Sequence, residues 1–281
     1  MFLKVFLRSF FIQAGWNYER FQNLGFAFCL QPALEKIYPD REKLRAAVLR
    51  HLQIFNTQPY MASFVLGNMA SLEERVAAAG SDQEARLKSM QGIKQALASS
   101  FASIGDRIFW GRLKPMTAQI CLLVWAAGGF YGWLFTDLET PVSMPLLLAG
   151  PLAGIVFYSA FAVYWRWRGL KAGYACGGEA SCGLDCANWP RLTRILSTAG
   201  FSMSVAIALL AFGTLTALNY PPQTDAGGLF LKIGLPLAVL ALHRVTRTFR
   251  KSVFFAAGLL LAVSVLLFSV LKLRPFKFYS W

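Results

Sequence analysis

The amino-acid sequence predicts an all-α integral membrane protein. Of its 281 residues, 56% are hydrophobic and only 15% are charged, whereas a soluble domain carries about a quarter charged residues. Apolar runs of about 20 residues recur in the second half of the chain, and this length lets a helix cross the hydrocarbon core of a bilayer. We therefore expect N-terminal amphipathic and re-entrant helical elements, followed by about four to five transmembrane helices.

The chain carries a formal net charge of +14. In a membrane protein such an excess usually lies in cytoplasmic loops and meets anionic headgroups. No basic and aromatic nucleic-acid-binding module is recognisable, so we expect the lipid bilayer, and no nucleic acid, as its partner. The start of the chain lacks an apolar stretch followed by a small-residue cleavage site, so we expect it to be retained rather than removed as a signal peptide.

Residues 1–30 are rich in phenylalanine but contain no uncharged run long enough for a simple span. We expect an interfacial helix followed by a re-entrant hairpin. Non-helical backbone at membrane depth is tolerated only where protein or a water-filled cavity covers it, so a hairpin here would itself indicate a transport site.

A second amphipathic element is predicted after a turn at residues 38–40. Apolar residues recur three or four positions apart, on one face of a helix. They are Leu44, Val48, Leu52 and Phe55. We interpret the element as a cytoplasmic or membrane-surface helix. His51 lies one residue off this line, and we interpret it as a packing or surface histidine rather than a phosphate carrier.

Pro59 breaks this helix, and a break frees backbone groups that can face a ligand. The apolar residues 60–72 are too few to cross the bilayer alone. We expect them to form the second arm of a re-entrant element or a buried helix, ended by the charged residues that begin at Glu73.

A capping box of Ser81 and Glu84 predicts a further helix that runs to about Ser100. Small residues follow it and allow close helix packing. Asp106 comes next, and an acidic group near the membrane is a functional candidate by default.

Four apolar segments after residue 115 are long enough to span the bilayer, and a fifth is shorter. The four are Met116–Phe135, Val142–Trp165, Ile195–Asn219 and Ser252–Leu271, and the shorter one is Gly227–Leu242. Basic and non-basic loops alternate between them, which predicts an N-terminal segment inside and a C terminus outside. The basic residues of the C-terminal tail count against this, and if Gly227–Leu242 is re-entrant the tail lies inside. We expect an N-terminal cytoplasmic and re-entrant region over residues 1–115 and a transmembrane helical region over residues 116–281.

The chain contains five cysteines, and the last three form a C-x5-C-x3-C pattern in a glycine-rich stretch. They are Cys29, Cys121, Cys176, Cys182 and Cys186. The pattern differs from the C-x2-C pair of a structural zinc site, so we expect free thiols, with a metal or redox site as the alternative. The glycine-rich motifs of nucleotide-binding loops are also absent from the sequence, and we predict no cofactor and no metal.

Three stretches place amide, carboxylate or guanidinium groups beside bulky aromatic residues. They are Gly15–Arg20, Phe55–Met61 and Ile104–Trp110. This combination is typical of sugar binding, because hydroxyls need paired hydrogen bonds and the apolar face of a sugar stacks on aromatic rings. The alternative is that the aromatic residues are anchors at the membrane surface. Three stretches within one segment favour the sugar site.

Several motifs of this segment occur in a characteristic order. They are Arg8-Ser9-Phe10, Trp16-Asn17-Tyr18-Glu19-Arg20, Gln22-Asn23-Leu24-Gly25-Phe26, Arg50-His51-Leu52, Phe55-Asn56-Thr57-Gln58-Pro59-Tyr60-Met61-Ala62, Ile104-Gly105-Asp106 and Phe109-Trp110-Gly111. In order and spacing, this run resembles the IID membrane subunit of the mannose/fructose/sorbose family of the bacterial phosphotransferase system. The resemblance ends near Pro115, and beyond it the likeness is mostly one of hydropathy and length.

The resemblance implies a multi-pass subunit of the bacterial cytoplasmic (inner) membrane. It would bind and translocate a hexose-type sugar together with a IIC subunit, within an oligomeric complex. Cytoplasmic IIA and IIB subunits would supply the phosphoryl group, so the chain would belong to a sugar-phosphorylating complex without itself being the phosphoryl carrier.

Seven residues of the three stretches are the expected sugar-binding side chains, and we expect no catalytic residue. They are Trp16, Asn17, Glu19, Arg20, Asn56, Gln58 and Asp106. We assign Asn56, Gln58 and Glu19 as partners of sugar hydroxyls. Trp16 is the expected stacking platform, and Arg20 is the expected orienting partner of a carboxylate.

The chain departs from the family pattern at three places. Gln58 replaces the usual histidine and lacks its titratable group. Residues 96–103 are nearly free of the family's glycines, and Arg107 stands where the family has a small residue or proline. These departures support an alternative, in which the chain is a regulatory or scaffold membrane subunit that docks phosphotransferase components without moving sugar. The identity of the sugar, the subunit stoichiometry and the role of the last three cysteines stay open at this point.

Overall fold

The computed structural model describes residues 1–79, 83–128, 143–177 and 184–217, together with six isolated residues after residue 230. This part of the chain is helical, with two isolated β-bridges. The chain divides into two compact units, of which the first comprises Met1–Phe130 and Pro141–Ala208. The second comprises Tyr131–Thr140 and Leu209–Trp281. All contacts analysed below lie in the first unit.

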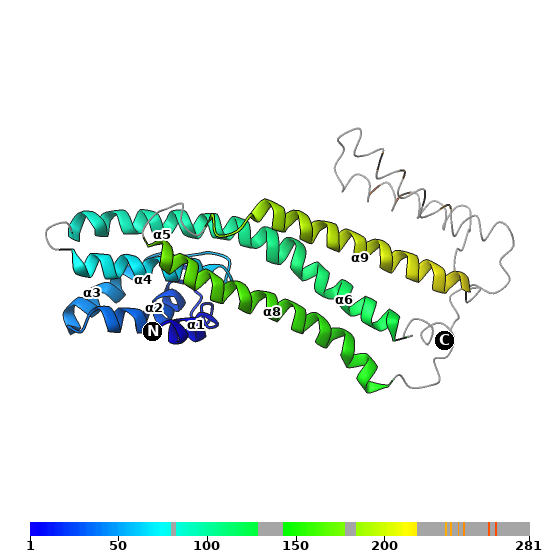
Figure 1. Cartoon of the computed structure of the whole chain (residues 1–281), viewed down its shortest axis with the longest axis horizontal. Coiled ribbons are helices and arrows are strands. Elements are labelled where there is room, and N and C mark those ends of the chain that lie inside the picture. Colours follow the sequence, from blue (N-terminus) through cyan, green and yellow to red (C-terminus); the bar gives the residue numbers. More distant parts are fainter. Residues whose placement is uncertain are drawn as a thin grey trace. The chain divides into compact units, whose positions relative to one another are not determined.

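Helix α1 (Phe2–Ser9) packs against α2 (Asn23–Ile37), as Figure 1 shows at the N-terminal end of the chain. A Cβ atom at Gly25 would lie 1.9 Å from the backbone oxygen of Ile12, so this close approach requires glycine. The connection between the two helices folds back through a series of turns.

Helix α3 (Arg41–His51) begins at Asp40, whose side chain accepts a hydrogen bond from the backbone N–H of Lys43 at 2.9 Å. The helix ends at His51. Leu52 and Phe55, which were predicted to share its apolar face, therefore lie beyond it. Phe55 is fully buried in the loop that follows.

Helix α4 (Ala62–Ala78) lies along α8 (Met144–Cys176). A Cβ atom at Gly67 would lie 2.2 Å from the backbone oxygen of Leu170, and the absence of that atom lets the two backbones touch. Nearly every residue of α4 up to Glu73 is buried, as expected for the buried-helix interpretation of residues 60–72.

The prediction that charged residues end this helix at Glu73 is wrong, because α4 continues to Ala78. Glu73 is completely buried, and its carboxylate is paired with Arg50 and His51 at the end of α3. A charge that finds its partner inside the protein does not force the helix to end in solvent.

Helix α5 (Gln83–Gly105), the π-helix η1 (Asp106–Leu113) and helix α6 (Lys114–Ala127) follow one another without a break. The predicted end near Ser100 is therefore too early. Gly105 keeps right-handed helical angles (φ −65°, ψ −44°), so this glycine does not terminate the helix. The predicted boundary at residue 115 lies within this uninterrupted run and stays a prediction. Ser81 lies outside the described residues.

Two described helices are long and apolar enough to cross a membrane: Met144–Cys176 in α8 and Trp189–Ala211 in α9 (Trp189–Ala217). They overlap the predicted spans that begin at residues 142 and 195. The predicted span from residue 116 begins in α6, and its part after residue 128 lies outside the described residues. Nearly all of the two last predicted spans also lies outside them. The total of four to five spans stays a prediction.

Aromatic side chains form the core where α4, α5, α8 and the start of α9 meet. Phe64 stacks on Phe101 with ring centroids 4.4 Å apart, and Trp165 lies 4.8 Å from Trp189. All four rings are buried. These contacts hold the long helices in a fixed arrangement around the segment between α3 and α4.

Candidate functional site

The first predicted stretch forms a tight reverse turn. The backbone N–H groups of Asn17 and Phe21 donate to each other's carbonyl oxygens at 3.0 and 2.9 Å. Phe21 has a φ of 56°, a left-handed conformation that costs free energy in a non-glycine residue. The Asn17 side chain fills the turn: its Oδ1 accepts from the Arg20 backbone N–H, and its Nδ2 donates to Asn23 Oδ1.

The turn is bonded to the second stretch. The Gln22 backbone N–H donates to the Phe55 oxygen at 2.9 Å, and the Phe55 N–H donates to the Arg20 oxygen at 3.3 Å. The Gln22 side chain continues this pairing, because its Nε2 donates to the Thr57 carbonyl at 2.9 Å and its Oε1 accepts from the Thr57 N–H at 3.1 Å. The side-chain amide of Gln22 thus exchanges with the Thr57 backbone the two hydrogen bonds that a paired residue of a neighbouring β-strand would make.

The loop at residues 51–57 is also bonded to α5 beneath it. Thr57 Oγ1 donates to the Ala98 oxygen at 2.8 Å, and Gln95 Nε2 donates to the Ile54 oxygen at 2.6 Å. Lys94 Nζ donates to the carbonyl oxygen of His51 at 3.3 Å. Three side-chain bonds spaced along one helix therefore hold the loop in place.

Gln58 connects the second stretch to the third. Its Oε1 accepts hydrogen bonds from the backbone N–H groups of Tyr60 and Met61 at 2.8 and 3.1 Å, just before α4 begins. Its Nε2 is buried and has no hydrogen-bond partner among the described residues. A Cβ atom at Gly105 would lie 2.5 Å from the Gln58 Cβ. The third stretch can therefore approach Gln58 this closely only because Gly105 has no side chain.

The structure therefore brings the backbones of the three predicted stretches together. Some of the predicted side chains are used in internal hydrogen bonds, and the others are exposed. Asn17 and Gln58 are used in internal hydrogen bonds. The other predicted residues are exposed: Trp16, Glu19, Arg20, Asn56 and Asp106. No ion pair of Arg20 with a carboxylate occurs among the described residues, and the Trp16 ring packs edge-on against Tyr18 with centroids 4.8 Å apart.

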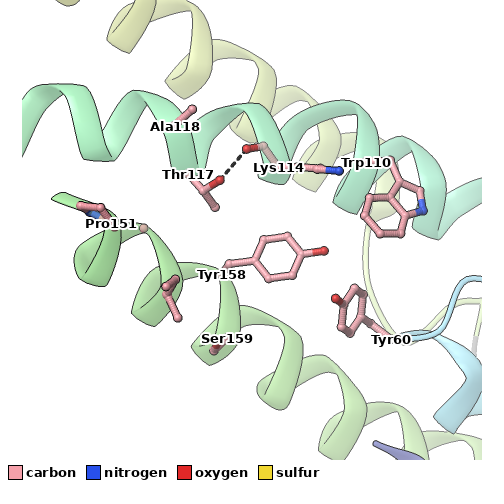
Figure 2. Close-up of a pocket in the computed structure, with 10 residues that line it drawn as sticks. Tyr60, Trp110, Lys114, Thr117, Ala118, Pro151, Tyr158 and Ser159 are labelled. Atoms are coloured by element: carbon pink, nitrogen blue, oxygen red, sulfur yellow. Dashed lines mark hydrogen bonds between the residues drawn. The ribbon is translucent and has the colours of Figure 1, made fainter. Parts of the chain in front are cut away.

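A groove begins where the second and third stretches end. It has a volume of about 480 Å³ and lies between α6 and α8, with Tyr60 and Trp110 at one end (Figure 2). Its polar groups come from Lys114, Thr117, Tyr158 and Ser159, and its apolar lining includes Pro151 and Ile155. The sequence motifs thus lead directly to a cavity of the size that small ligands occupy.

Arg166 fixes Tyr60 at the end of this groove. Its guanidinium lies between the rings of Tyr60 and Phe10, 5.0 and 4.9 Å from their centroids. Its Nη1 donates to the Ser9 carbonyl at 2.6 Å. Tyr60 also stacks on Phe109, with ring centroids 4.7 Å apart. A buried arginine of a candidate membrane span thereby joins α1, α8 and the second stretch.

A second polar cluster lies behind the loop, centred on the carboxylate of Glu73. Arg50 Nε and His51 Nε2 lie 2.7 Å from its Oε1, and Arg50 Nη2 and the Tyr38 hydroxyl donate to its Oε2 at 2.8 and 2.7 Å. Burial alone would raise the pKa of Glu73, but the hydrogen bonds from Arg50 and His51 and the positive charge of Arg50 outweigh burial and lower it to about 2. Glu73 is therefore ionised.

The other groups of this cluster are also shifted. Burial lowers the pKa of His51, against the opposing effect of Glu73, so the imidazole is neutral and donates from Nε2 to the carboxylate. Burial lowers the pKa of Lys94 to about 7, and its Nζ lies 4.4 Å from the ring centroid of Phe26. Burial and the hydrogen bond to Glu73 raise the pKa of Tyr38.

Several residues that build the site had no role in the sequence prediction. Gln22 lay in a quoted motif without an assigned function, and Glu73 was interpreted only as a helix end. Lys94 and Tyr158 lay in no motif, and only contacts across the fold reveal them. The free-thiol prediction is wrong for Cys176, which is in a disulfide. Cys186 is free, and Cys182 lies outside the described residues.

Comparison with known proteins gives matches over most of the chain. The family described as "PTS system mannose/fructose/sorbose family IID component" matches residues 1–225. The PTS system mannose-specific EIID component of Escherichia coli (strain K12) is 34% identical over 174 residues, which are 62% of this chain and 54% of that protein. The chain thus spans about half the length of this relative.

Two further relatives have related names. The fructose permease IID component of Bacillus subtilis (strain 168) is 30% identical over 217 residues, covering 77% of this chain and 70% of that protein. The PTS system sorbose-specific EIID component of Klebsiella pneumoniae is 32% identical over 176 residues, which are 62% of this chain and 56% of that protein.

Two solved structures are similar. One, described as "Structure of membrane protein", has a TM-score of 0.56 and 25% identity and covers 95% of both chains. A chain of the complex between the mannose transporter ManYZ and microcin E492 has a TM-score of 0.48 and 26% identity, with 97% of both chains covered.

Proposed function

The chain belongs to the mannose/fructose/sorbose family of phosphotransferase IID components, and from this membership we propose that it is the membrane subunit of a sugar permease. It binds a hexose-type sugar jointly with a IIC subunit and moves it across the bacterial cytoplasmic membrane. IIA and IIB subunits supply the phosphoryl group, and this chain docks IIB at the inner face.

One observation supports this proposal above the others. The loop from Phe55 to Tyr60 is bonded to the turn before it and to α5 beneath it, and it places Tyr60 at the end of a groove beside a candidate membrane span. A loop that is fixed at so many points is pre-organised, so binding a ligand costs little ordering entropy.

The predicted sugar contacts agree with this geometry to different degrees. Asn56 is exposed between buried Phe55 and buried Thr57, so its amide is available for hydroxyl groups. Glu19 and Asp106 are exposed as well. Gln58 offers only its buried Nε2, because Oε1 is already used by two backbone N–H groups. We keep Asn56 and Glu19 as hydroxyl partners and Trp16 as a platform.

The experiment is a binding measurement on the assembled complex. The chain is co-expressed with the IIC-like membrane protein of the same source, and the purified pair is titrated calorimetrically with mannose, fructose and glucosamine. We expect saturable binding that is lost in Asn56→Ala. The matched control is Gln53→Ala, because Gln53 is an exposed amide on the same loop.

The outcomes separate the proposal from its alternative. Binding that is unchanged in both Asn56→Ala and Glu19→Ala contradicts the assignment of these contacts but leaves the family membership untouched. A well-folded complex that binds no sugar contradicts the transport proposal and favours the docking subunit without transport, with Gln58 and Arg107 as the first positions to revert to the family pattern.

A further inference from the structure

Helix α8 changes its chemical character after Tyr164. From Met144 to Tyr164 the helix carries no charged side chain. The residues that follow alternate between aromatic and basic, and they are Trp165, Arg166, Trp167 and Arg168. Tryptophan and basic residues at the end of an apolar span are typical of the boundary between hydrocarbon and headgroups. The charge pattern therefore places this part of α8 at the membrane surface.

Helix α1 gives a second, independent indication of the same level. It packs against this part of α8, where the Phe6 and Trp167 rings meet with centroids 5.1 Å apart. Leu3 and Leu7, one turn apart on α1, are nevertheless more than half exposed. An exposed apolar face on a short helix is typical of a helix that lies in the plane of the membrane interface.

A hollow of about 450 Å³ lies on α8 at this level. Its lining consists of Tyr164, Trp167, Arg168, Lys171, Ala172 and Ala175. Both charged side chains of the lining are basic, and neither forms an ion pair among the residues that the structure describes. The hollow therefore offers two positive charges to an anion.

Aromatic groups hold these two cations in place without neutralising them. The Lys171 ammonium lies 4.6 Å from a ring centroid of Trp167. The Arg168 guanidinium donates from Nη1 to the Tyr164 hydroxyl at 2.7 Å and from Nη2 to the Cys186 carbonyl at 3.2 Å. Each of these nitrogens carries two hydrogens, so Arg168 is oriented and still has donors for a further acceptor.

These groups fit the phosphate of a membrane lipid. Arginine and lysine bind phosphate oxygens through charge-assisted hydrogen bonds. An apolar track leads from the hollow along α8, because Leu152, Val156 and Val163 share one face of the helix and are exposed. A lipid places an acyl chain on this track, whereas a free phosphate makes no use of it.

We propose that the hollow formed by Tyr164, Trp167, Arg168 and Lys171 binds the headgroup of a phospholipid with net negative charge. The exposed apolar face of α8 takes one acyl chain of the same lipid. This site goes beyond the proposed permease function, and it does not depend on which sugar the chain carries.

The test is lipid binding to the purified full chain, measured by native mass spectrometry in detergent. The probes are phosphatidylglycerol and phosphatidylcholine with identical acyl chains, together with glycerol 3-phosphate, which has the phosphate but no acyl chain. We expect phosphatidylglycerol to bind about five times more tightly than phosphatidylcholine or better, because each basic residue near an anionic lipid contributes about a factor of five.

Variants of the two cations test the position of the site. The double variant Arg168→Gln with Lys171→Gln should raise the Kd for phosphatidylglycerol about tenfold or more. Lys171→Gln alone leaves the hydrogen bonds of Arg168 in place and should raise Kd about three- to fivefold, whereas Lys171→Arg keeps the charge and should bind like wild type.

The matched control is the double variant Arg41→Gln with Lys43→Gln. It removes the same charge from two exposed positions of α3, and its Kd should stay within about twofold of wild type. An unchanged circular dichroism spectrum establishes that each variant is folded. If the α8 double variant does not fold, the comparison of Lys171→Gln with Lys171→Arg decides the question.

Selective binding of phosphatidylglycerol that weakens in the α8 variants and not in the α3 control supports the site. Equal affinity for the two lipids, or no binding of either, overturns it. Equal losses in the two double variants also overturn it, because the attraction would then depend on net charge alone. Displacement of the lipid by an equal concentration of glycerol 3-phosphate overturns the lipid as the occupant.

Discussion

Gln22 and Thr57 exchange two hydrogen bonds, one in each direction, although they lie 35 positions apart in the sequence. Both residues are buried, so neither bond competes with water. The pair joins the reverse turn at residues 17–21 to the loop that leads into the groove. The contribution of these two hydrogen bonds to the free energy of unfolding is the first property to measure.

Replacing Gln22 with leucine should destabilise the protein by about 1–3 kcal/mol, because the N–H and carbonyl of Thr57 would stay buried without partners. The measurement is the thermal unfolding midpoint in detergent. Gln13→Leu is the control, since Gln13 is exposed, and it should change stability by no more than about 0.5 kcal/mol. Equal midpoints for the two variants would show that the Gln22 bonds contribute no net stability.

Replacing Glu73 with alanine should cost about 3–5 kcal/mol, because Arg50 would lose its buried partner and the Lys94 charge would lose the opposite charge nearby. Glu84→Ala is the matched control. Glu84 pairs with Lys88 at 3.6 Å on an exposed surface of α5, and such pairs contribute between about 0 and 1 kcal/mol. Denaturant titration of both variants measures the difference, and a loss in Glu73→Ala no larger than in the control contradicts the prediction.

Lys94 should make stability depend on pH on the alkaline side of neutrality. Its pKa is lowered from 10.5 to about 7, because burial penalises the charged form more than the Glu73 carboxylate favours it. Between these two values the unfolded chain binds more protons than the folded chain, so stability rises with pH. Below about pH 7 the Lys94 contribution is constant and unfavourable.

The measurement compares wild type with Lys94→Met between pH 7.5 and about 9. Wild type should gain stability relative to the variant by at most about 1.4 kcal/mol per pH unit, the limit for one proton. Among the groups around Lys94, His51 and Glu73 have pKa values lowered below this window, and Arg50 stays charged. Parallel curves for the two proteins would show that Lys94 keeps its ordinary pKa.

Two glycines of α5 should respond in opposite directions to substitution by alanine. At Gly105 the new Cβ would lie 2.5 Å from the Gln58 Cβ and 2.8 Å from the Met61 Cγ, so the loop must shift and the protein loses stability. At Gly92 no atom lies within 4 Å of the new Cβ, and the helix gains about 0.5–1 kcal/mol. Unfolding midpoints decide the signs. A neutral Gly105→Ala would mean that the contact with Gln58 is easily relaxed.

The sequence predicted the helical class, because that class depends on local patterns. The role of the three stretches in sugar binding stays a prediction. Apolar runs define α8 and α9. The helix that was predicted to break at Pro59 already ends at His51. The residues that complete the site escaped prediction for a physical reason. Glu73 meets Arg50 and His51 across 22–23 positions of sequence, and local charge patterns carry no information about such pairings.

The predicted stretches were also assigned their functions from residue type alone. Gln58 was expected to face a sugar, but its Oε1 is used by the backbone at the start of α4. Tyr158 was invisible in the sequence, because a tyrosine in an apolar run is typical of many membrane spans. Whether a polar atom is used or available depends on the fold around it.

The uninterrupted helical run from Gln83 to Ala127 has a mechanical consequence. Near one end, Lys94, Gln95 and Ala98 hold the loop at residues 51–57, and near the other end α6 forms a wall of the groove. A continuous helix transmits torque, so a rotation of α6 about its own axis would turn the loop anchors with it. The motions of the loop at residues 51–57 and of the groove between α6 and α8 are therefore coupled through this helical run.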